Sequence, residues 1–463
     1  MIVLEHRIAA GRPARECLWY AADFRNLPQW DRSVTAVEKM TEGAIGSGAR
    51  FELRTRNGMR EQLLHYEILR FSPPYAATLR GEGDGVTVVD DIRIESTDRG
   101  CLLHWRVEIR LRSGWLENLA RPWIQRNVQR AAQALERALR APEPARLGFG
   151  GYLADRLVLP GAARFTRQGF QAARLAPIVE RAEGRHIVIT GATSGLGEAA
   201  ATALARRGAR LTIIGRDGQR LRALVKHLRV DSGCRARIIE ADLLDLEQTA
   251  QAGRQLLQDD PPDVLINNAG ALFAGRDESP QGFERALAIN ALSPLLLMDM
   301  LGPAMPSGSR IINVVSGGMY LTPLRLHDLQ YHQGRYDGAT AYGRAKRILT
   351  VIGMRRARAW PHLAVHAMHP GWADTPGVRR SLPAFHRLMR PLLRDAVQGA
   401  DTAVWLALSA AGAESRNGVW FDRVPHPIDV LPSTRLRSAQ IDALDGQMCT
   451  LIGPWLSTQG AAA

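Results

Sequence analysis

Tyr342 and Lys346 stand four residues apart in the stretch AYGRAK, a spacing that places both side chains on one face of a helix. Of the 60 Lys and Arg residues only three are lysines, namely Lys39, Lys226 and Lys346. With eight tyrosines in the chain, roughly 0.05 Tyr-x-x-x-Lys matches are expected by chance. Because an ammonium, unlike a guanidinium, is a compact charge with a tunable pKa, the pattern favours a catalytic pair over a solvated helix pair.

A glycine-rich loop, GATSGLG, lies between the apolar run HIVIT at 186–190 and an alanine-rich helical stretch. Glycines in this place let the backbone turn tightly, approach a pyrophosphate and begin a helix against the strand. From 184 onward strand and helix patterns alternate, which predicts a doubly wound parallel sheet of the Rossmann type. The candidate cofactor-binding residues of the loop are Gly191, Thr193, Ser194, Gly195, Leu196 and Gly197.

The next apolar run, ARLTIIGRD, indicates which nicotinamide cofactor is bound. Sites that prefer NAD carry an acidic residue at the end of this strand, where it binds the ribose 2′-hydroxyl. Here Gly215 is followed by Arg216, whose guanidinium suits a 2′-phosphate. We therefore expect NADP, with NAD less favoured, although Asp217 follows one position later.

The order of these motifs resembles the short-chain dehydrogenase/reductase superfamily, whose form of the loop is T-G-x-x-x-G-x-G, here at 190–197. The resemblance implies that Tyr342 is the general acid/base and that Lys346 binds the nicotinamide ribose and lowers the phenol pKa. It also implies that Ser316 holds the substrate oxygen and that Asn290 relays protons through water. Besides Tyr342 and Lys346, the further cofactor contacts that it implies are Asp242, Leu243, Asn268, Ala269, Gly270, Pro370, Gly371 and Thr375.

Ser316 and Tyr342 are 26 residues apart, wider than in compact members of the superfamily. The intervening stretch 324–340 resembles the insertion of retinol-dehydrogenase-like members. The sequence over about 164–430 resembles the dehydrogenase/reductase SDR family member 12 type, above all in the segments SGGMY, AYGRAKR, MHPGWADTPGVRR and GVWFDR. We interpret 376–395 as a substrate lid.

Residues 1–141 carry short β-rich segments at 50–56, 61–69, 86–96 and 101–111. A long helix is expected from Trp115 to Leu139, and this pattern predicts an antiparallel sheet folded around one helix. The opening HRIAAGRPARECLWYAADFRNLPQWDRSVTAVE resembles the START-like superfamily of polyketide cyclases and hydrophobic-ligand carriers, which implies an α+β helix-grip domain with an apolar cavity. The helical stripe expected to be buried is Leu116, Leu119, Trp123, Ile124, Val128, Ala131, Leu135 and Leu139.

The predicted domains are a START-like ligand-binding domain at 1–141, a linker with a basic amphipathic segment at 142–183, and a Rossmann domain at 184–463. Peripheral membrane contact through 152–180 is one reading of the linker. Packing between the domains is the favoured alternative, because Pro160 and Gly161 interrupt its apolar face.

Other site types are less favoured by the pattern. His362 and His366 have helical metal-pair spacing but stand in an apolar run that reads as a strand, so we expect no metal. Lone carboxylates in the first domain are interpreted as a solvated face rather than as an acid/base pair; they are Asp90, Asp91, Glu95 and Glu108.

Composition excludes several function classes. The net charge of +14 comes from arginines spread along the whole chain, which does not favour nucleic-acid binding. The four cysteines show no paired spacing, and neither a signal peptide nor a membrane span is expected, so we predict a cytoplasmic protein.

We therefore predict an NADP-dependent oxidoreductase acting on a lipophilic carbonyl or alcohol, with a first domain that presents hydrophobic ligand. Family members often pair through the helices that carry Asn290 and Tyr342, so a homo-oligomer is a family expectation. Two alternatives stay open: a lipid carrier or sensor with a nucleotide site, and a fusion of a polyketide-type cyclase with a ketoreductase.

Overall fold

The computed structural model describes residues 1–57, 60–140, 163–414 and 418–456. The chain divides into two compact units. The first contains Met1–Glu143 with two short later segments, Ala176–Arg181 and Leu228–Cys234, and the second contains the rest. The proposed boundaries at 141 and 183 stay predictions, and most of the predicted linker, 142–162, lies outside the described residues.

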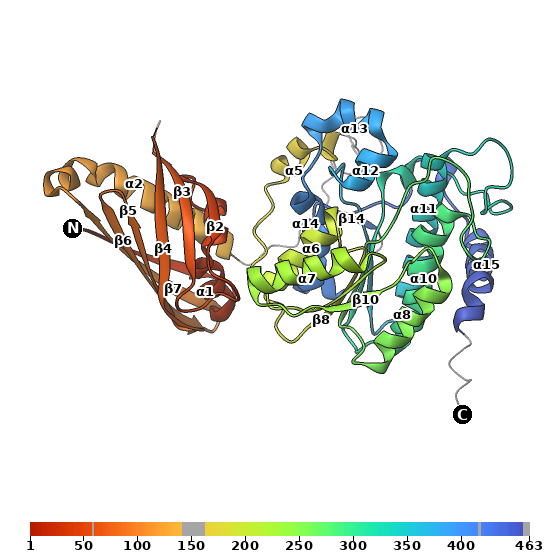
Figure 1. The fold of residues 1–463 in the computed structure, drawn as a ribbon, viewed down its shortest axis with the longest axis horizontal. Helices are drawn as coiled ribbons and strands as arrows, with labels where there is room; N and C mark the ends of the chain where they lie inside the picture. The colour runs from red at the N-terminus through yellow and green to blue at the C-terminus, as the bar shows by residue number, and fades with distance from the viewer. Residues whose placement is uncertain (58–59, 141–162, 415–417, 457–463) are drawn as a thin grey trace. The chain divides into compact units, whose positions relative to one another are not determined.

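The first unit is an antiparallel sheet in the order β1-β7-β6-β5-β4-β3-β2, with the long helix α2 lying along it (Figure 1). Alternating residues of the strands face α2, which gives the unit its apolar core. This α+β arrangement confirms the predicted helix-grip fold. Its elements are β1 (Ile2–Ala10), α1 (Ala14–Ala22), η1 (Phe24–Gln29), β2 (Val34–Lys39), β3 (Arg50–Asn57), β4 (Arg60–Ser72), β5 (Ala76–Gly83), β6 (Val86–Thr97), β7 (Gly100–Leu111) and α2 (Gly114–Leu139).

The expected burial of the α2 stripe is wrong at two positions. Leu119 is 74% exposed and Trp123 is 48% exposed, whereas Ile124, Leu135 and Leu139 are buried. Successive residues of a helix are rotated by about 100°. Ile124 therefore takes the core-facing position, and Trp123 and Leu119, which are one turn apart, share a face that points away from the sheet.

The second unit is built on an eight-stranded sheet in the order β10-β9-β8-β11-β12-β13-β14-β15. All neighbouring strands are parallel except β14 and β15, which confirms the predicted Rossmann fold. The order reverses between β8 and β11, where ligands bind in such sheets. The strands are β8 (His186–Thr190), β9 (Arg210–Gly215), β10 (Arg237–Glu240), β11 (Val264–Asn267), β12 (Arg310–Val314), β13 (Ala364–Met368), β14 (Val419–Phe421) and β15 (Val424–His426).

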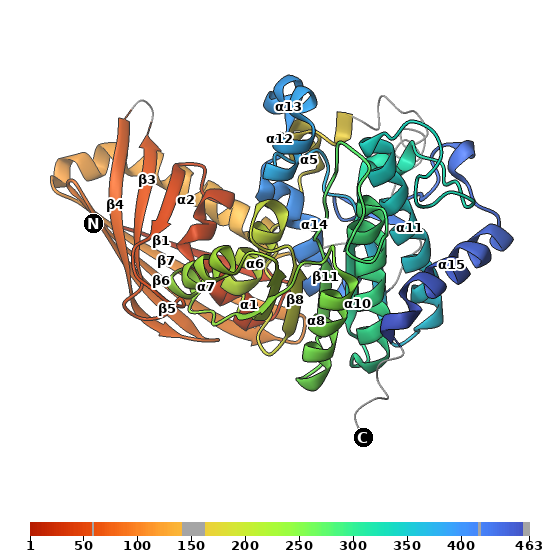
Figure 2. The same ribbon diagram turned by 45° about the vertical axis from the view of Figure 1, so that its right-hand side comes forward.

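Helices cover both faces of this sheet, with α8, α10 and α11 on one face and α6 and α14 on the other (Figure 2). The main helices are α6 (Gly195–Arg206), α7 (Gly218–Ser232), α8 (Leu246–Gln258), α10 (Ser293–Leu301), α11 (Gly338–Ala359), α14 (Ala396–Leu408) and α15 (Ser438–Leu456). Shorter helical segments are α5 (Arg167–Ala173), α9 (Arg285–Leu287), η2 (Ala288–Leu292), η3 (Gly302–Ala304), η4 (Gly317–Tyr320), α12 (Pro376–Ser381), α13 (Pro383–Met389), η5 (Arg390–Leu392), η6 (Ala410–Ala413) and η7 (Pro432–Thr434).

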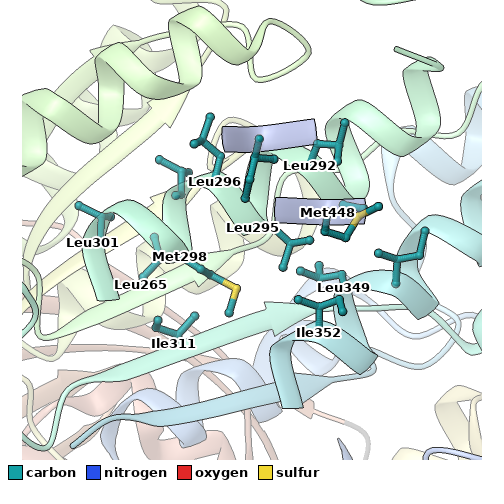
Figure 3. Close-up of a cluster of buried hydrophobic side chains, with 14 of the residues drawn as sticks. Leu265, Leu292, Leu295, Leu296, Met298, Leu301, Ile311, Leu349, Ile352 and Met448 are labelled. Atoms are coloured by element: carbon teal, nitrogen blue, oxygen red, sulfur yellow. The ribbon is translucent and has the colours of Figure 1, made fainter. Parts of the chain in front are cut away.

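The main core of the second unit gathers around α10 (Figure 3). By length and composition, Arg285–Ala304 is the one helical segment among the described residues that is apolar enough to cross a membrane, but 83% of its best window is buried inside the unit. That burial accounts for its apolar composition. The core side chains labelled in Figure 3 include Leu292, Leu295, Leu296 and Met298 with Leu349, Ile352 and Met448.

The C-terminal helix α15 is part of the same core. Its side chains Leu444, Met448 and Ile452 are fully buried. Arg356 on α11 pairs with Asp299 on α10 at 2.7 Å and with Asp445 on α15 at 2.8 Å. The three helices are therefore joined by apolar contacts and by a buried charge network.

Candidate active site

The glycine loop that follows β8 has a backbone that only glycine fits. Gly191 and Gly195 have φ of 66° and 57°, in the left-handed region. A Cβ at Gly197 would lie 2.3 Å from the carbonyl oxygen of Gly191. Ser194 is the N-cap residue of α6, but its side chain makes no capping hydrogen bond. That side chain therefore satisfies none of the N–H groups in the first turn of the helix. The loop therefore suits a pyrophosphate at the helix N-terminus.

Thr190 and Asn268 join the ends of β8 and β11. The Thr190 hydroxyl accepts hydrogen bonds from the backbone N–H groups of Asn268 and Ala269, each at 3.0 Å. The Asn268 side-chain amide donates to the carbonyl oxygens of Thr190 at 3.0 Å and Gly191 at 3.1 Å. The Asn268 side chain thus holds the backbone at the start of the glycine loop. This is a structural role in addition to the predicted cofactor contact.

Two acidic residues near Arg216, Asp217 and Asp242, accept hydrogen bonds from backbone N–H groups. The Arg216 side chain is 67% exposed, and its Nη1 lies 4.0 Å from an oxygen of Asp242. Asp217 accepts from the N–H of Arg220 at 3.0 Å and so caps the start of α7. Asp242 accepts from the N–H of Leu244 at 3.0 Å. Leu243, the other predicted adenine contact, is buried.

Tyr342 and Lys346 both project from α11, with the Lys346 ammonium 5.8 Å from the centre of the Tyr342 ring. Lys346 is buried and donates to the carbonyl oxygen of Val314 at 2.9 Å. Burial lowers the pKa of Lys346 to about 7. Burial raises the pKa of Tyr342 to about 12, and a hydrogen bond with Ser316 opposes that rise. The fold thus brings Ser316 and Tyr342 together across their unusually long separation in the chain.

Asn290 lies in a π-helical turn, η2, of a kind that often marks functional sites. Its side-chain amide donates to the carbonyl oxygens of Ala271 at 2.8 Å and Ala286 at 2.9 Å, and its Oδ1 accepts from the Ala271 N–H. A Cβ at Gly270 would lie 2.6 Å from the Asn290 Oδ1 and 3.1 Å from the Lys346 Nζ. These groups therefore converge on Gly270, whereas the proton relay through Asn290 stays a prediction.

The loop that follows β13 contributes Pro370, Gly371 and Thr375. Gly371 has φ of 74°, which again requires glycine. The Thr375 hydroxyl accepts from the N–H of Val378 at 3.3 Å and caps α12. A Cβ at Gly195 would lie 3.2 Å from Thr375, so this loop meets the glycine loop at the predicted cofactor site.

Two residues beside this site, Phe165 and Arg394, are not among the residues that the sequence predicts for it. Phe165 falls in the stretch interpreted as a linker, and Arg394 falls in the predicted lid, yet both lie in the second unit against the Pro370–Gly371 loop. Neither stands in a recognisable motif or a periodic pattern, so no local signal could have found them.

The histidines with metal-pair spacing have other partners. The ring of His366 lies 2.9 Å from the Gly412 carbonyl oxygen and accepts from the Trp420 indole N–H at 3.1 Å. Burial lowers its pKa to about 4. His366 is therefore a hydrogen-bonded core residue of β13. Within the described ranges, no group of three or more His, Cys, Asp or Glu suits a metal ion.

The first unit holds a buried carboxyl group that the sequence analysis placed on a solvated face. Asp90 is only 5% exposed, because its position on β6 faces the core. It accepts from the Trp105 indole N–H at 2.9 Å and from the Tyr66 hydroxyl. Burial raises the pKa of Asp90 to about 6. The expectation is thus wrong for Asp90, while Glu95, with a side chain 71% exposed, is solvated as expected.

Two family models match the chain. Residues 185–323 match the model described as short chain dehydrogenase, and residues 1–140 match the model described as polyketide cyclase / dehydrase and lipid transport.

Curated relatives are similar to about half of the chain or more. Dehydrogenase/reductase SDR family member 12 from Bos taurus is 34% identical over 287 residues, covering 60% of this chain and 90% of that protein. Retinol dehydrogenase 12 from Mus musculus is 32% identical over 246 residues, covering 51% of this chain and 77% of that protein. Polyprenol dehydrogenase from Mus musculus is 29% identical over 256 residues, covering 52% of this chain and 76% of that protein.

Proposed function

Because this chain belongs to the short-chain dehydrogenase family, we propose that it is an NADP(H)-dependent oxidoreductase that interconverts a lipophilic carbonyl compound and its alcohol. The observation that carries the proposal is the meeting of Ser316, Tyr342 and Lys346, with the Lys346 ammonium beside Gly270 at the end of the β11 loop. A protein that only bound nucleotide would need no such set of acid/base groups.

Each of these side chains has a task in the reduction of a carbonyl. The Tyr342 phenol donates its proton to the carbonyl oxygen, and the Ser316 hydroxyl holds that oxygen by a hydrogen bond. The Lys346 ammonium stabilises the phenolate that remains on Tyr342. When bound, the nicotinamide supplies the hydride for reduction or accepts it for oxidation. In oxidation the Tyr342 phenolate takes the proton of the alcohol.

The residues of the cofactor site fit NADP(H). The glycine loop leaves no room for side chains where the pyrophosphate backbone would pass. Arg216 is exposed at the end of β9, where a 2′-phosphate would be recognised. The neighbouring Asp217 is engaged in capping α7 and is not placed to favour a 2′-hydroxyl instead.

A lipophilic substrate is supported by the relatives. Retinol dehydrogenase and polyprenol dehydrogenase are named for apolar alcohols, and the first unit matches a family described by lipid transport. The helices α12 and α13, in the predicted lid, carry an apolar side chain, Leu388, that is 78% exposed. We propose that this region covers the substrate and that the first unit binds hydrophobic ligand.

Titration of the full chain with NADPH and with NADH tests the cofactor assignment, using energy transfer from its ten tryptophans. Arg216→Ala should weaken NADPH binding by about tenfold or more and leave NADH binding within twofold, because it removes a partner of the 2′-phosphate. Arg220→Ala is the matched control, since Arg220 is an exposed arginine four residues later, in the first turn of α7, that pairs with Asp217. Binding of neither nucleotide by the wild-type chain would contradict the proposal.

The C-terminal helix α15 bears on the homo-oligomer expected from the family. This helix packs over α10 and α11 of the same chain. Its Met448 side chain covers one face of those two helices, and that face is therefore not free. We therefore expect the second unit not to pair through that face. Light scattering gives the oligomeric state of the eluted protein, and a dimer whose crosslinked contacts map to the side of α10 and α11 under α15 would contradict this expectation.

A further inference from the structure

A short strap, defined here as Arg164–Thr166, packs against the second unit beside the candidate site. The ring of Phe165 stacks on His369 with centroids 4.5 Å apart and an interplanar angle of 28°. The same ring meets the edges of Trp372 at 5.8 Å and Phe421 at 5.2 Å. The strap is thus packed against β14 and against the loop that follows β13 and contains Pro370 and Gly371.

The backbone of the strap is held by one buried arginine. Arg394, 1% exposed, donates to the carbonyl oxygens of Phe165 at 3.1 Å, Thr166 at 3.2 Å and Arg164 at 2.6 Å. Its guanidinium also pairs with Asp422 at 2.6 Å and 2.9 Å. A fourth link is the N–H of Trp372, which donates to the Phe165 carbonyl oxygen at 2.8 Å. A guanidinium with this many partners fixes both the position and the direction of the strap.

The strap also lies against the backbone that carries the catalytic serine. Gly317 follows Ser316 directly, and a Cβ built there would lie 2.6 Å from the His369 ring nitrogen Nε2 and 3.2 Å from a ring carbon of Phe165. On the other side, a Cβ at Gly371 would lie 2.5 Å from the Arg394 Nε. The strap and its clamp therefore support both the serine turn and the Pro370–Gly371 loop.

We propose that Phe165 is a positioning residue for the carbonyl site: the strap, clamped by Arg394, holds the ring of Phe165 against His369 and Gly317 and so fixes the turn that carries Ser316. This inference rests on the proposed oxidoreductase function and adds to it a residue that precedes the region matched by the short chain dehydrogenase model, which begins at 185. Removing the ring leaves a gap behind Gly317, into which the Ser316 turn relaxes.

The activity test compares Phe165→Ala with Phe170→Ala in the full chain, with NADPH and all-trans-retinal as the probe substrate. Phe170 is the matched control because its ring also lies near Arg394, at 5.1 Å, but belongs to α5 rather than the strap. Phe165→Ala should lower kcat by about tenfold, as displacement of a catalytic group does, with the Kd for NADPH within twofold. Phe165→Leu, which keeps most of the volume, should recover most of kcat.

A pH profile separates positioning from general loosening. The Ser316 hydrogen bond lowers the pKa of Tyr342, so a displaced Ser316 should move the rising limb of retinol oxidation to higher pH in Phe165→Ala. Phe170→Ala should keep the wild-type profile. Equal kcat and equal profiles for the two alanine variants would overturn the inference.

Hydrogen exchange measures the same effect without turnover. The Gly318 N–H donates to the Ser316 hydroxyl at 3.4 Å, and its exchange should accelerate by about tenfold in Phe165→Ala but not in Phe170→Ala. If wild type reduces no retinal and binds no NADPH, the proposed function fails, while exchange still decides the role of Phe165. Unchanged exchange of residues 315–320 in Phe165→Ala would contradict the positioning role.

Discussion

In each unit of this protein a tyrosine lies beside an ionisable side chain, and the two clusters differ in how their polar groups are paired. In the first unit Tyr66 and Trp105 both donate to Asp90, so the hydroxyl and the indole of this cluster already have a partner. In the second unit Lys346, which has three N–H donors, makes one described bond, to the Val314 carbonyl oxygen, and Tyr342 pairs with a hydroxyl that can reorient.

The difference shows that a buried ionisable group with a shifted pKa does not by itself mark an active site. The Asp90 cluster is a closed hydrogen-bond network that stabilises the interior of a sheet. The Tyr342 cluster keeps donor capacity next to a glycine-lined loop, where a substrate oxygen and a ribose would be bound. The two clusters are therefore distinguished less by burial than by the hydrogen-bond donors that the Tyr342 cluster keeps beside space for a ligand.

The largest expected effect separates the two tyrosines. Tyr342→Phe should lower NADPH-dependent reduction by about a thousandfold, because it removes the proton donor and keeps the ring. Tyr66→Phe should change turnover by less than about twofold. Steady-state assays with retinal, with NADPH titrations of both variants, make the comparison. Similar losses in the two variants would place catalysis outside the Tyr342 cluster.

A pH-dependent stability is expected from Lys346. Its pKa in the folded chain is about 7 against 10.5 when exposed, so the unfolded chain binds more protons between these values. Stability of the second unit should therefore rise as pH increases from 7 toward 10, by about 2 to 3 kcal/mol. Lys346→Met should lack this rise, which urea unfolding of both proteins at pH 7 and 9.5 measures. A parallel rise in the variant would assign it to other titrating groups and contradict the role given to Lys346.

Asp90 should show the opposite sign in a lower pH window. Its pKa in the folded chain is about 6 against 3.8 when exposed, so the folded chain binds more protons in between. The first unit should therefore lose about 2 kcal/mol of stability as pH rises from 4 to 6. Asp90→Asn should remove this loss, because an amide of the same shape still accepts from Trp105. Unfolding monitored from pH 4 to 7 tests it, with Asp91→Asn, the next residue on β6, as the control; a wild-type slope in Asp90→Asn would exclude the assignment.

Local patterns of the sequence were enough for the fold classes and for the core of the site. The apolar run before the glycine loop predicted β8 and the N-terminus of α6, because strand, tight turn and helix start are set by neighbouring residues. The Tyr-x-x-x-Lys spacing predicted that both side chains share a face of α11, since a helix repeats every 3.6 residues.

Other features required the folded chain, because their partners are distant in sequence and follow no period. The strand pattern alone predicts Asp90 on the solvent side, and only the packing of β6 against the first-unit core places it inside. The bonds between Thr190 and Asn268 cross 78 residues, and the bond between Arg394 and Phe165 crosses 229. The sequence by itself determined which groups could do chemistry and on which elements they stand. Tertiary packing decided which of them meet and which keep donors unpaired, because long-range contacts depend on the whole core and not on any local repeat.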